Sequence, residues 1–200
     1  DAKSAGTNFT GSLIIGHQTT GTLDAAEYNT AVGLTAMDAI TSGDHNTAVG
    51  YASLGANTTG ARNTAVGKDA LLVNTTGTQN TGLGATSLDA NTTGTQNTAV
   101  GYGSLGANTT ASYNTAVGRE ALITNTTGAS NVAIGTDALQ VNTTGANNVA
   151  IGHDALDANT TASNNVAIGH QSLTANTTGA GSVAIGTSAL ATNTTTSNNT

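Results

Sequence analysis

Apolar and polar residues follow a pattern along this chain that repeats every 17 residues. Most units open with a run such as Asn-Thr-Ala-Val-Gly, have a leucine four residues after that glycine, and continue with Asn-Thr-Thr. A fixed period of this kind is typical of repeat proteins, in which each unit stacks on the next. The units begin, without insertion or deletion, at Asn29, Asn46, Asn63, Asn80, Asn97, Asn114, Asn131, Asn148, Asn165 and Ser182, and Asn199-Thr200 begins another.

Two positions of the unit, numbered from 1 at its opening residue, are consistently apolar and large. Position 4 is always a branched aliphatic residue, and position 9 is leucine in every unit but the first, which has Met37. The branched residues favour a strand over positions 2 to 4, with positions 2 and 4 on one face and the small position 3 on the other. We expect positions 4 and 9 to form two stripes of a core. The predicted core residues are Val49, Leu54, Val66, Leu71, Val100, Leu105, Val117, Leu122, Ile134, Leu139, Ile151, Leu156, Ile168 and Leu173.

Turns are expected at position 5 and at positions 12 to 14. Position 5 is glycine in every unit, which indicates either a positive φ or a close approach of two backbones. The Asn-Thr-Thr segment is typical of turns. The predicted turn glycines are Gly50, Gly67, Gly101, Gly118, Gly135, Gly152 and Gly169.

The alternative of one helix per unit fits the pattern poorly. The glycine and the Asn-Thr-Thr segment leave too few residues between them for a helix of ordinary length, roughly 10–12 residues. Two short strands and two turns per unit fit better. We therefore predict an all-β parallel β-solenoid, or β-roll, of about ten to eleven coils of 17 residues. At ~4.8 Å per coil it would form a rod of roughly 50 Å.

The first part of the chain is less regular. Residues 12–28 resemble a degenerate first coil or cap, because Ser12-Leu13-Ile14-Ile15-Gly16 matches the start of a unit. Residues 1–11 are expected to form an N-terminal tail. Residues 29–200 are the repeat solenoid, which we expect to continue past the C-terminus.

Composition narrows the possible functions. Aromatic residues make up 2% of the chain and charged residues 8%, so one coil builds only a thin core and we expect solenoids to pack on one another. The net charge is −7, with four lysines and arginines, which argues against nucleic acid as a partner. No apolar run approaches the ~20 residues of a membrane span. We expect no nucleic acid and no membrane insertion.

The candidate chemical groups do not predict catalysis. Asp69, Asp137 and Asp154 share position 7, but no pattern pairs two carboxylates in a pocket. We predict no enzyme, no catalytic residues and no cofactor. His153 and His170 share position 6 with His17, and stacked imidazoles could bind a transition metal. We favour exposed turn residues and assign no metal site.

The asparagines of position 12 have two interpretations. Stacked amides can form a hydrogen-bonded ladder along parallel coils, while Asn-Thr-Thr is also an acceptor sequence for N-linked glycans. We favour the ladder, since glycans every ~4.8 Å would crowd one another. These residues are Asn57, Asn74, Asn91, Asn108, Asn125, Asn142, Asn159, Asn176 and Asn193.

The unit also resembles repeats of known families. Asn-Val-Ala-Ile-Gly, at residues 131–135, 148–152 and 165–169, resembles the core motif of trimeric autotransporter adhesin heads, which are YadA-like β-rolls with Hep/Hag-type repeats. The longer unit at residues 46–60 resembles repeats of phage tail-fibre-like and bacterial surface proteins. The resemblance covers residues 12–200. It implies a homotrimer. The small residues of position 3 give each solenoid a second, flat face, which we expect at the subunit interface.

The expected function is a non-enzymatic structural fibre, an extracellular, cell-surface or virion shaft or head that acts as a stiff spacer for adhesion. Its partners would be further copies of the chain, in a trimer and possibly an end-to-end filament, and a cell-surface or glycan receptor. Tyr51, Tyr102 and Arg119 on the variable rim are candidates for recognition. The alternative is an ice-binding solenoid that uses ladders of threonine, at positions 13 and 14 and in part at position 2.

Overall fold

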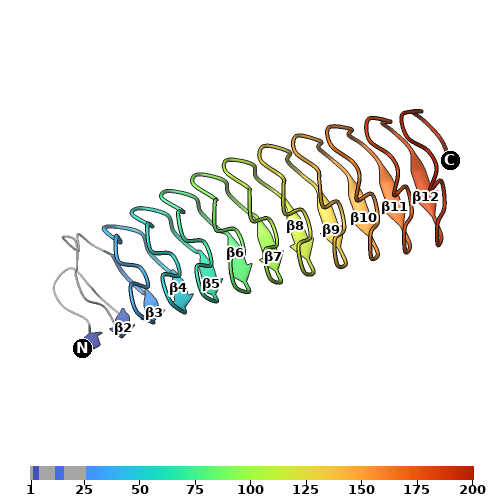
Figure 1. The fold of residues 1–200 in the computed structure, drawn as a ribbon. Helices are drawn as coiled ribbons and strands as arrows, with labels where there is room; N and C mark the ends of the chain where they lie inside the picture. The colour runs from blue at the N-terminus through green and yellow to red at the C-terminus, as the bar shows by residue number, and fades with distance from the viewer. Residues whose placement is uncertain (1, 5–11, 16–25) are drawn as a thin grey trace.

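The computed structural model describes residues 2–4, 12–15 and 26–200. These residues form a row of stacked coils, each of which contributes one strand to a single sheet (Figure 1). No helix occurs among the described residues. The predicted all-β parallel solenoid is therefore confirmed.

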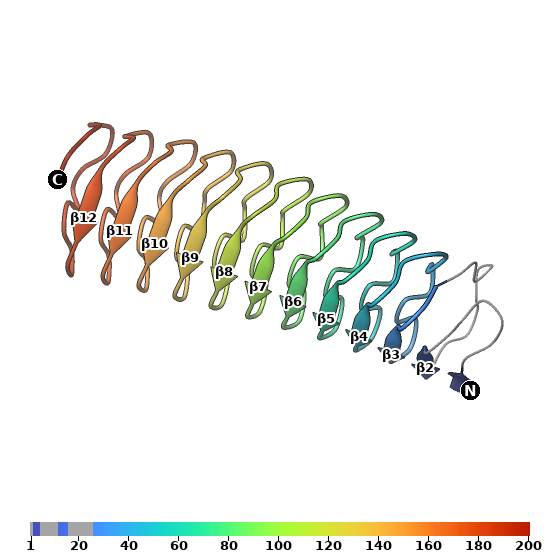
Figure 2. The ribbon, with the colours of Figure 1, turned by 180° about the vertical axis from the view of Figure 1, so that it is seen from behind.

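The strands are short and follow the sequence order across the sheet, as the view from behind also shows (Figure 2). Strands β2 to β11 each pair in parallel with the next, and β1 pairs antiparallel with β2. The register shifts by one unit from strand to strand, so that Ala99 lies beside Ala116. The strands are β1 Ala2–Ser4, β2 Leu13–Ile15, β3 Thr30–Val32, β4 Thr47–Val49, β5 Thr64–Val66, β6 Thr81–Leu83, β7 Thr98–Val100, β8 Thr115–Val117, β9 Val132–Ile134, β10 Val149–Ile151, β11 Val166–Ile168 and β12 Val183–Ile185.

The N-terminal segments are described only in part. Of the predicted tail, residues 2–4 form β1, and of the predicted first coil, residues 13–15 form β2 in parallel with β3. The remaining residues of the tail, and residues 16–25 of the first coil, lie outside the described residues.

Half of the predicted core residues lie in the core, and the other half do not. Position 3 alanines, position 8 alanines and serines, and the position 9 leucines fill the coils, and all seven leucines of the predicted core are fully buried. The position 4 side chains lie on the outer face of the strand instead, half-buried or exposed. The strand does alternate as expected, but the interior is too thin to hold a branched residue opposite leucine, so alanine points inward. The corrected residues are Val49, Val66, Val100, Val117, Ile134, Ile151 and Ile168.

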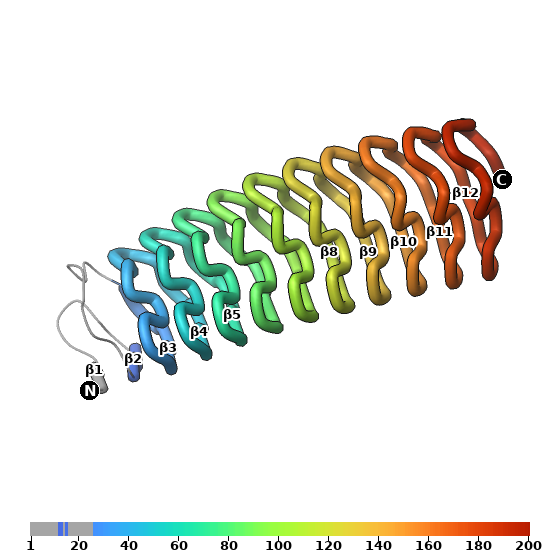
Figure 3. The backbone as a smooth tube through the Cα atoms, viewed as in Figure 1, coloured from blue at the N-terminus to red at the C-terminus, as the bar shows by residue number. Residues whose placement is uncertain are grey.

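Each coil contains one strand rather than the expected two. The leucine segment is a series of turns, because the leucine itself has a left-handed backbone, with φ of 51° at Leu105. Stacking continues through these turns, where the Leu105 amide donates to the Ala121 carbonyl (3.0 Å) and the Ala107 amide to the Ile123 carbonyl (2.8 Å). The smooth tube in Figure 3 shows the same winding path in each coil.

The seven predicted turn glycines meet both conditions proposed for them. Gly118 has φ of +139°, and a Cβ on it would lie 2.4 Å from the Gly135 carbonyl oxygen of the next coil. Only glycine allows this conformation and this approach at once.

Candidate functional site

The most extensive candidate surface is the outer face of the sheet. We call the position 2 and position 4 side chains of β3 to β12 the strand face. Its pattern is Thr-x-Val or Thr-x-Leu from β3 to β8 and Val-x-Ile from β9 to β12. Because every strand is in the same register, these side chains form continuous rows along the rod. The position 4 row is a contiguous strip of half-buried or exposed apolar side chains, a feature typical of an interaction surface.

The position 12 asparagines form a hydrogen-bonded ladder inside the coils. Asn74 Nδ2 donates to Asn57 Oδ1 (2.9 Å) and to the Gly77 carbonyl (3.1 Å), and the same pair of bonds recurs in later coils. All these residues from Asn57 to Asn176 are fully buried, and Asn193 in the last coil is half-buried. A buried Nδ2 that already donates twice has no room for a glycan. The ladder therefore replaces the glycosylation interpretation for the fully buried residues.

A second ladder runs through position 1. The Asn114 backbone amide donates to Asn97 Oδ1 (3.0 Å), while Asn97 Nδ2 donates to the Ala111 carbonyl (2.9 Å). Asn108 of the first ladder also donates to Ala111 (3.1 Å). The two ladders thus join at position 15 and satisfy the polar groups of an otherwise apolar interior.

The threonines of positions 13 and 14 lie in a turn between one strand and the next. The Thr58 hydroxyl donates to the Thr75 carbonyl (3.1 Å), and the position 13 hydroxyls of later coils do the same. Position 14, such as Thr59, is exposed. These residues are not part of a strand. Only the position 2 threonines lie on the strand face, and they end at Thr115.

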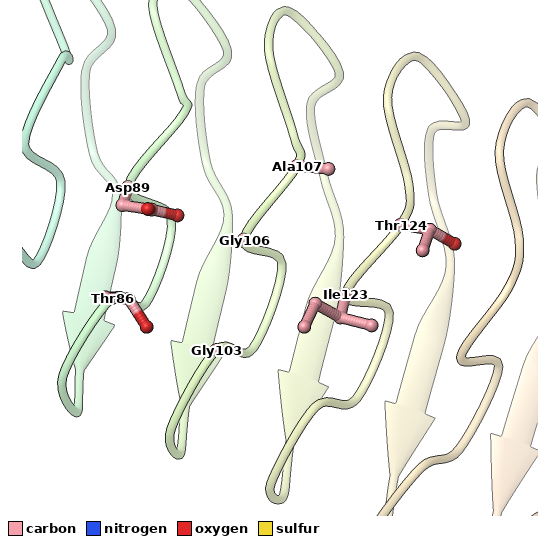
Figure 4. A pocket seen from close by; sticks show the side chains of 7 residues that line it. All are labelled: Thr86, Asp89, Gly103, Gly106, Ala107, Ile123 and Thr124. Carbon is pink, nitrogen blue, oxygen red and sulfur yellow. The ribbon is translucent and has the colours of Figure 1, made fainter.

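Two equivalent hollows lie on the surface of the rod that residues of positions 7, 10 and 11 form. One has a volume of about 420 Å³ and spans three successive coils, with Gly103, Gly106 and Ala107 on the middle coil and Ile123 on the next (Figure 4). The other has a volume of about 540 Å³, with Ala52, Gly55 and Ala56 beneath Leu72. Except for Ala39, which lines only the second, the lining residues of the two correspond at a separation of 51 residues, which is three units of 17. The hollow in Figure 4 is therefore one of a repeated pair.

Each hollow carries one carboxylate, Asp89 in the hollow of Figure 4 and Asp38 in the other. Burial raises the pKa of Asp89 above its ordinary value of 3.8, and the charge of Asp69 adds to that effect, against backbone hydrogen bonds that lower it. Neither lining set contains a second carboxylate, a histidine or a lysine. Within these hollows there is no pair of groups for general acid–base chemistry.

The rim at positions 6 and 7 carries six of the 15 charged side chains. Lys68 pairs with Asp69 and lies 5.8 Å from the centre of the Tyr51 ring. The hydrogen bond to Asp69, and then the charge of Asp69, raise the pKa of Lys68.

Arg119 pairs with Glu120 and, in the next coil, with Asp137 (3.2 Å). Tyr51, Tyr102 and Arg119 are all exposed on this rim.

The structure brings two of the three position 6 histidines together. The rings of His153 and His170 stack with centroids 5.5 Å apart, and His153 Nδ1 lies 2.9 Å from Asp154 Oδ2. His17 lies outside the described residues. A different stack joins Tyr28 to His45, with ring centroids 5.0 Å apart. The sequence placed the histidines in one column but did not indicate that Asp154 would join them.

Comparisons with protein-family models, with curated proteins and with solved structures gave no match to this chain. Among the described residues, no helix is long and apolar enough to cross a membrane.

Proposed function

We propose that this chain is a structural fibre segment, a shaft or head in which three solenoids associate through their strand faces. The observation that carries this proposal is the unbroken row of branched aliphatic side chains at position 4 of the strand face, on a rod of continuously bonded coils. The fibre would be extracellular, on a cell surface or on a virion, and would act as a stiff spacer for adhesion. Its mechanism is mechanical rather than chemical.

Hydrogen bonding between coils supports the stiffness. Within the coil at residues 97–113, the backbone amide of Thr98 donates to the following coil and that of Gly101 to the preceding one, each at 2.8 Å. Leu105 and Thr109 add two further bonds to the following coil, at 3.0 and 3.2 Å. Bonds of this kind recur in coil after coil. Bending the rod would stretch them on one side, so the geometry resists curvature.

The position of the branched residues supports association. Ile151 and Ile168 lie outside the thin core, next to Val149 and Val166 on the same face. Burial of apolar surface stabilises by about 25 cal/mol per Å², and repetition along the rod adds these gains together. The interface is therefore proposed at the Val and Ile rows, whereas the position 3 alanines that the sequence placed there are buried inside the coil.

Light scattering on residues 1–200 tests the proposal. We expect a mass three times the 19.4 kDa of one chain, with narrow rods in negative-stain images. Ile151→Lys places a charge on the strand face and should give monomers. Thr144→Lys places the same charge in the exposed turn of positions 13 and 14, away from the strand face, and should leave the trimer intact. Circular dichroism must show that both variants stay folded. A wild-type monomer at all concentrations would contradict the proposal.

Ice binding is the second candidate, and one observation favours it. The position 2 threonines of β3 to β8 form a regular row on an exposed sheet face. If the chain is monomeric, that face is free, and thermal hysteresis should appear in a nanolitre osmometer. Thr98→Lys should abolish it, whereas Thr110→Lys on the far turn should not.

A further inference from the structure

The parallel register places two histidines side by side. Ile151 of β10 pairs with Ile168 of β11, and in both coils the histidine follows two residues later, after the glycine. The Gly169 amide donates to the Ile151 carbonyl (2.8 Å), and the Gln171 amide donates to the His153 carbonyl (3.0 Å). Hydrogen bonds therefore hold the backbone on both sides of His170. The rings of His153 and His170 stack with an interplanar angle of 18°.

Asp154 completes a set of three possible ligands. Its Oδ2 lies 2.9 Å from His153 Nδ1, and one ligand atom of each residue lies within 4.8 Å of those of the other two. Both histidines are exposed and Asp154 is half-buried. Ligand atoms around a metal at about 2.1 Å lie roughly 3–3.5 Å apart, so small rotations of the exposed side chains are sufficient to close the set.

We propose that His153, Asp154 and His170 bind one divalent transition-metal ion across two coils. Two imidazoles and a carboxylate suit Zn²⁺, Ni²⁺ or Cu²⁺, whereas Ca²⁺ and Mg²⁺ prefer oxygen ligands only. Because the side chains stand on the rim, further coordination positions face solvent. The ion links neighbouring coils through side chains, in addition to the backbone hydrogen bonds. The site is independent of the fibre function.

The repeat itself supplies matched substitutions. Position 6 is threonine in the two flanking coils, at Thr136 and Thr187, so His153→Thr and His170→Thr restore a side chain that the same turn already carries. His45 is the control, because it stacks on Tyr28 and belongs to no such cluster among the described residues. His45→Thr removes one imidazole without touching the proposed ligands.

Isothermal titration with ZnCl₂ and with NiCl₂ tests the proposal on the 200-residue chain. We expect one ion per chain, a loss of affinity of at least a hundredfold in His153→Thr and His170→Thr, and wild-type affinity in His45→Thr. Asp154→Asn should weaken binding at least tenfold. Added Zn²⁺ should also raise the unfolding temperature of the wild type, but not of His170→Thr, and a chelator should reverse the shift.

Two results would overturn the site. One is stoichiometric binding that survives both histidine substitutions, which would place the ion elsewhere. The other is the absence of any saturable binding of either metal to the folded wild type. Unchanged affinity in Asp154→Asn would remove Asp154 from the ligand set.

Discussion

At the scale of the residue, the position 5 glycine carries two separate constraints that can be measured apart. Gly118 combines φ of +139° with a next coil that leaves no room for a Cβ, whereas Gly186 has φ of +124° with nothing within 4 Å. Gly186→Ala should cost only the backbone strain, about 1–3 kcal/mol. Gly118→Ala should cost distinctly more, because a methyl group would meet the Gly135 carbonyl. Urea unfolding followed by circular dichroism measures both, and equal losses would show that close approach adds nothing.

Asp89 gives a pH dependence whose sign follows from its surroundings. Its pKa in the folded state lies above the ordinary value of 3.8, mainly because of burial. The folded chain therefore holds this proton more tightly than the unfolded chain, and stability falls as Asp89 ionises with rising pH. Asp89→Asn should raise the unfolding temperature slightly at pH 7 and lose that advantage below pH 3.8. A gain of the same size at pH 3 would contradict the assignment.

At the scale of the element, each coil depends on a side-chain ladder as well as on its strand. Asn108 Nδ2 donates to Asn91 Oδ1 (2.8 Å) and Ala111 O (3.1 Å), and Asn108 Oδ1 accepts from Asn125 (3.2 Å). Asn108→Asp removes both donors and leaves a buried carboxylate facing oxygen atoms. We expect a loss of more than about 3 kcal/mol in the free energy of unfolding.

Asn193 provides the matched control for this change. It makes the same two types of bond, to Asn176 Oδ1 (3.1 Å) and Thr196 O (3.0 Å), but it lies half-buried in the last coil. Because water can solvate the new carboxylate there, Asn193→Asp should lower the unfolding temperature far less. If the two variants lose the same stability, burial of the ladder is not the cause.

The strand shows which features of a coil can be predicted from the sequence. The 17-residue period fixes the register, and the alternation around Val100 fixes which side chains share a face. Alternation alone does not say which face points inward, and hydrophobicity suggested the wrong one. The informative signal was volume: position 3 is never larger than alanine, while position 4 varies among valine, leucine and isoleucine. A site that tolerates no increase in size is the confined one.

The backbone of the segment around the position 9 leucine could not be predicted from the sequence in the same way. Leu105, Leu122 and their equivalents have φ near 50°, a region that leucine seldom adopts. The leucine at position 9 predicted a buried strand. The predicted burial was correct, but this segment forms turns rather than a strand. Asp154 illustrates a further limit, because its contact with His153 depends on the turn geometry rather than on the spacing of the ligands.

At the scale of the whole molecule, the rod is a one-dimensional stack in which each coil contacts only its neighbours. Strand contacts link β7 to β6 and to β8, and the described strands have no contacts further away. The stability of such a protein is approximately the sum of unit terms and neighbour-interface terms. Ile185 in the last of these coils is 68% exposed.

This additivity predicts that a larger deletion is tolerated better than a smaller one. Removing residues 97–113 deletes one whole unit and brings Gly84 beside Gly118 and Asn91 beside Asn125, each a like residue at a like position. The rod should shorten by one coil, ~4.8 Å, and unfold cooperatively with a modest loss of stability. Removing only residues 97–105 leaves eight residues that cannot close a coil.

In the shorter deletion, residues 106–113 must leave the stack as a loop, or the stack must break at that point. Either outcome adds a cost in chain entropy that the longer deletion avoids. Thermal unfolding should therefore rank wild type first, the deletion of residues 97–113 second and the deletion of residues 97–105 last. Limited proteolysis should cut the third protein within residues 106–113 and leave the second intact. The reverse order of the two deletions would mean that coils do not stack as interchangeable units.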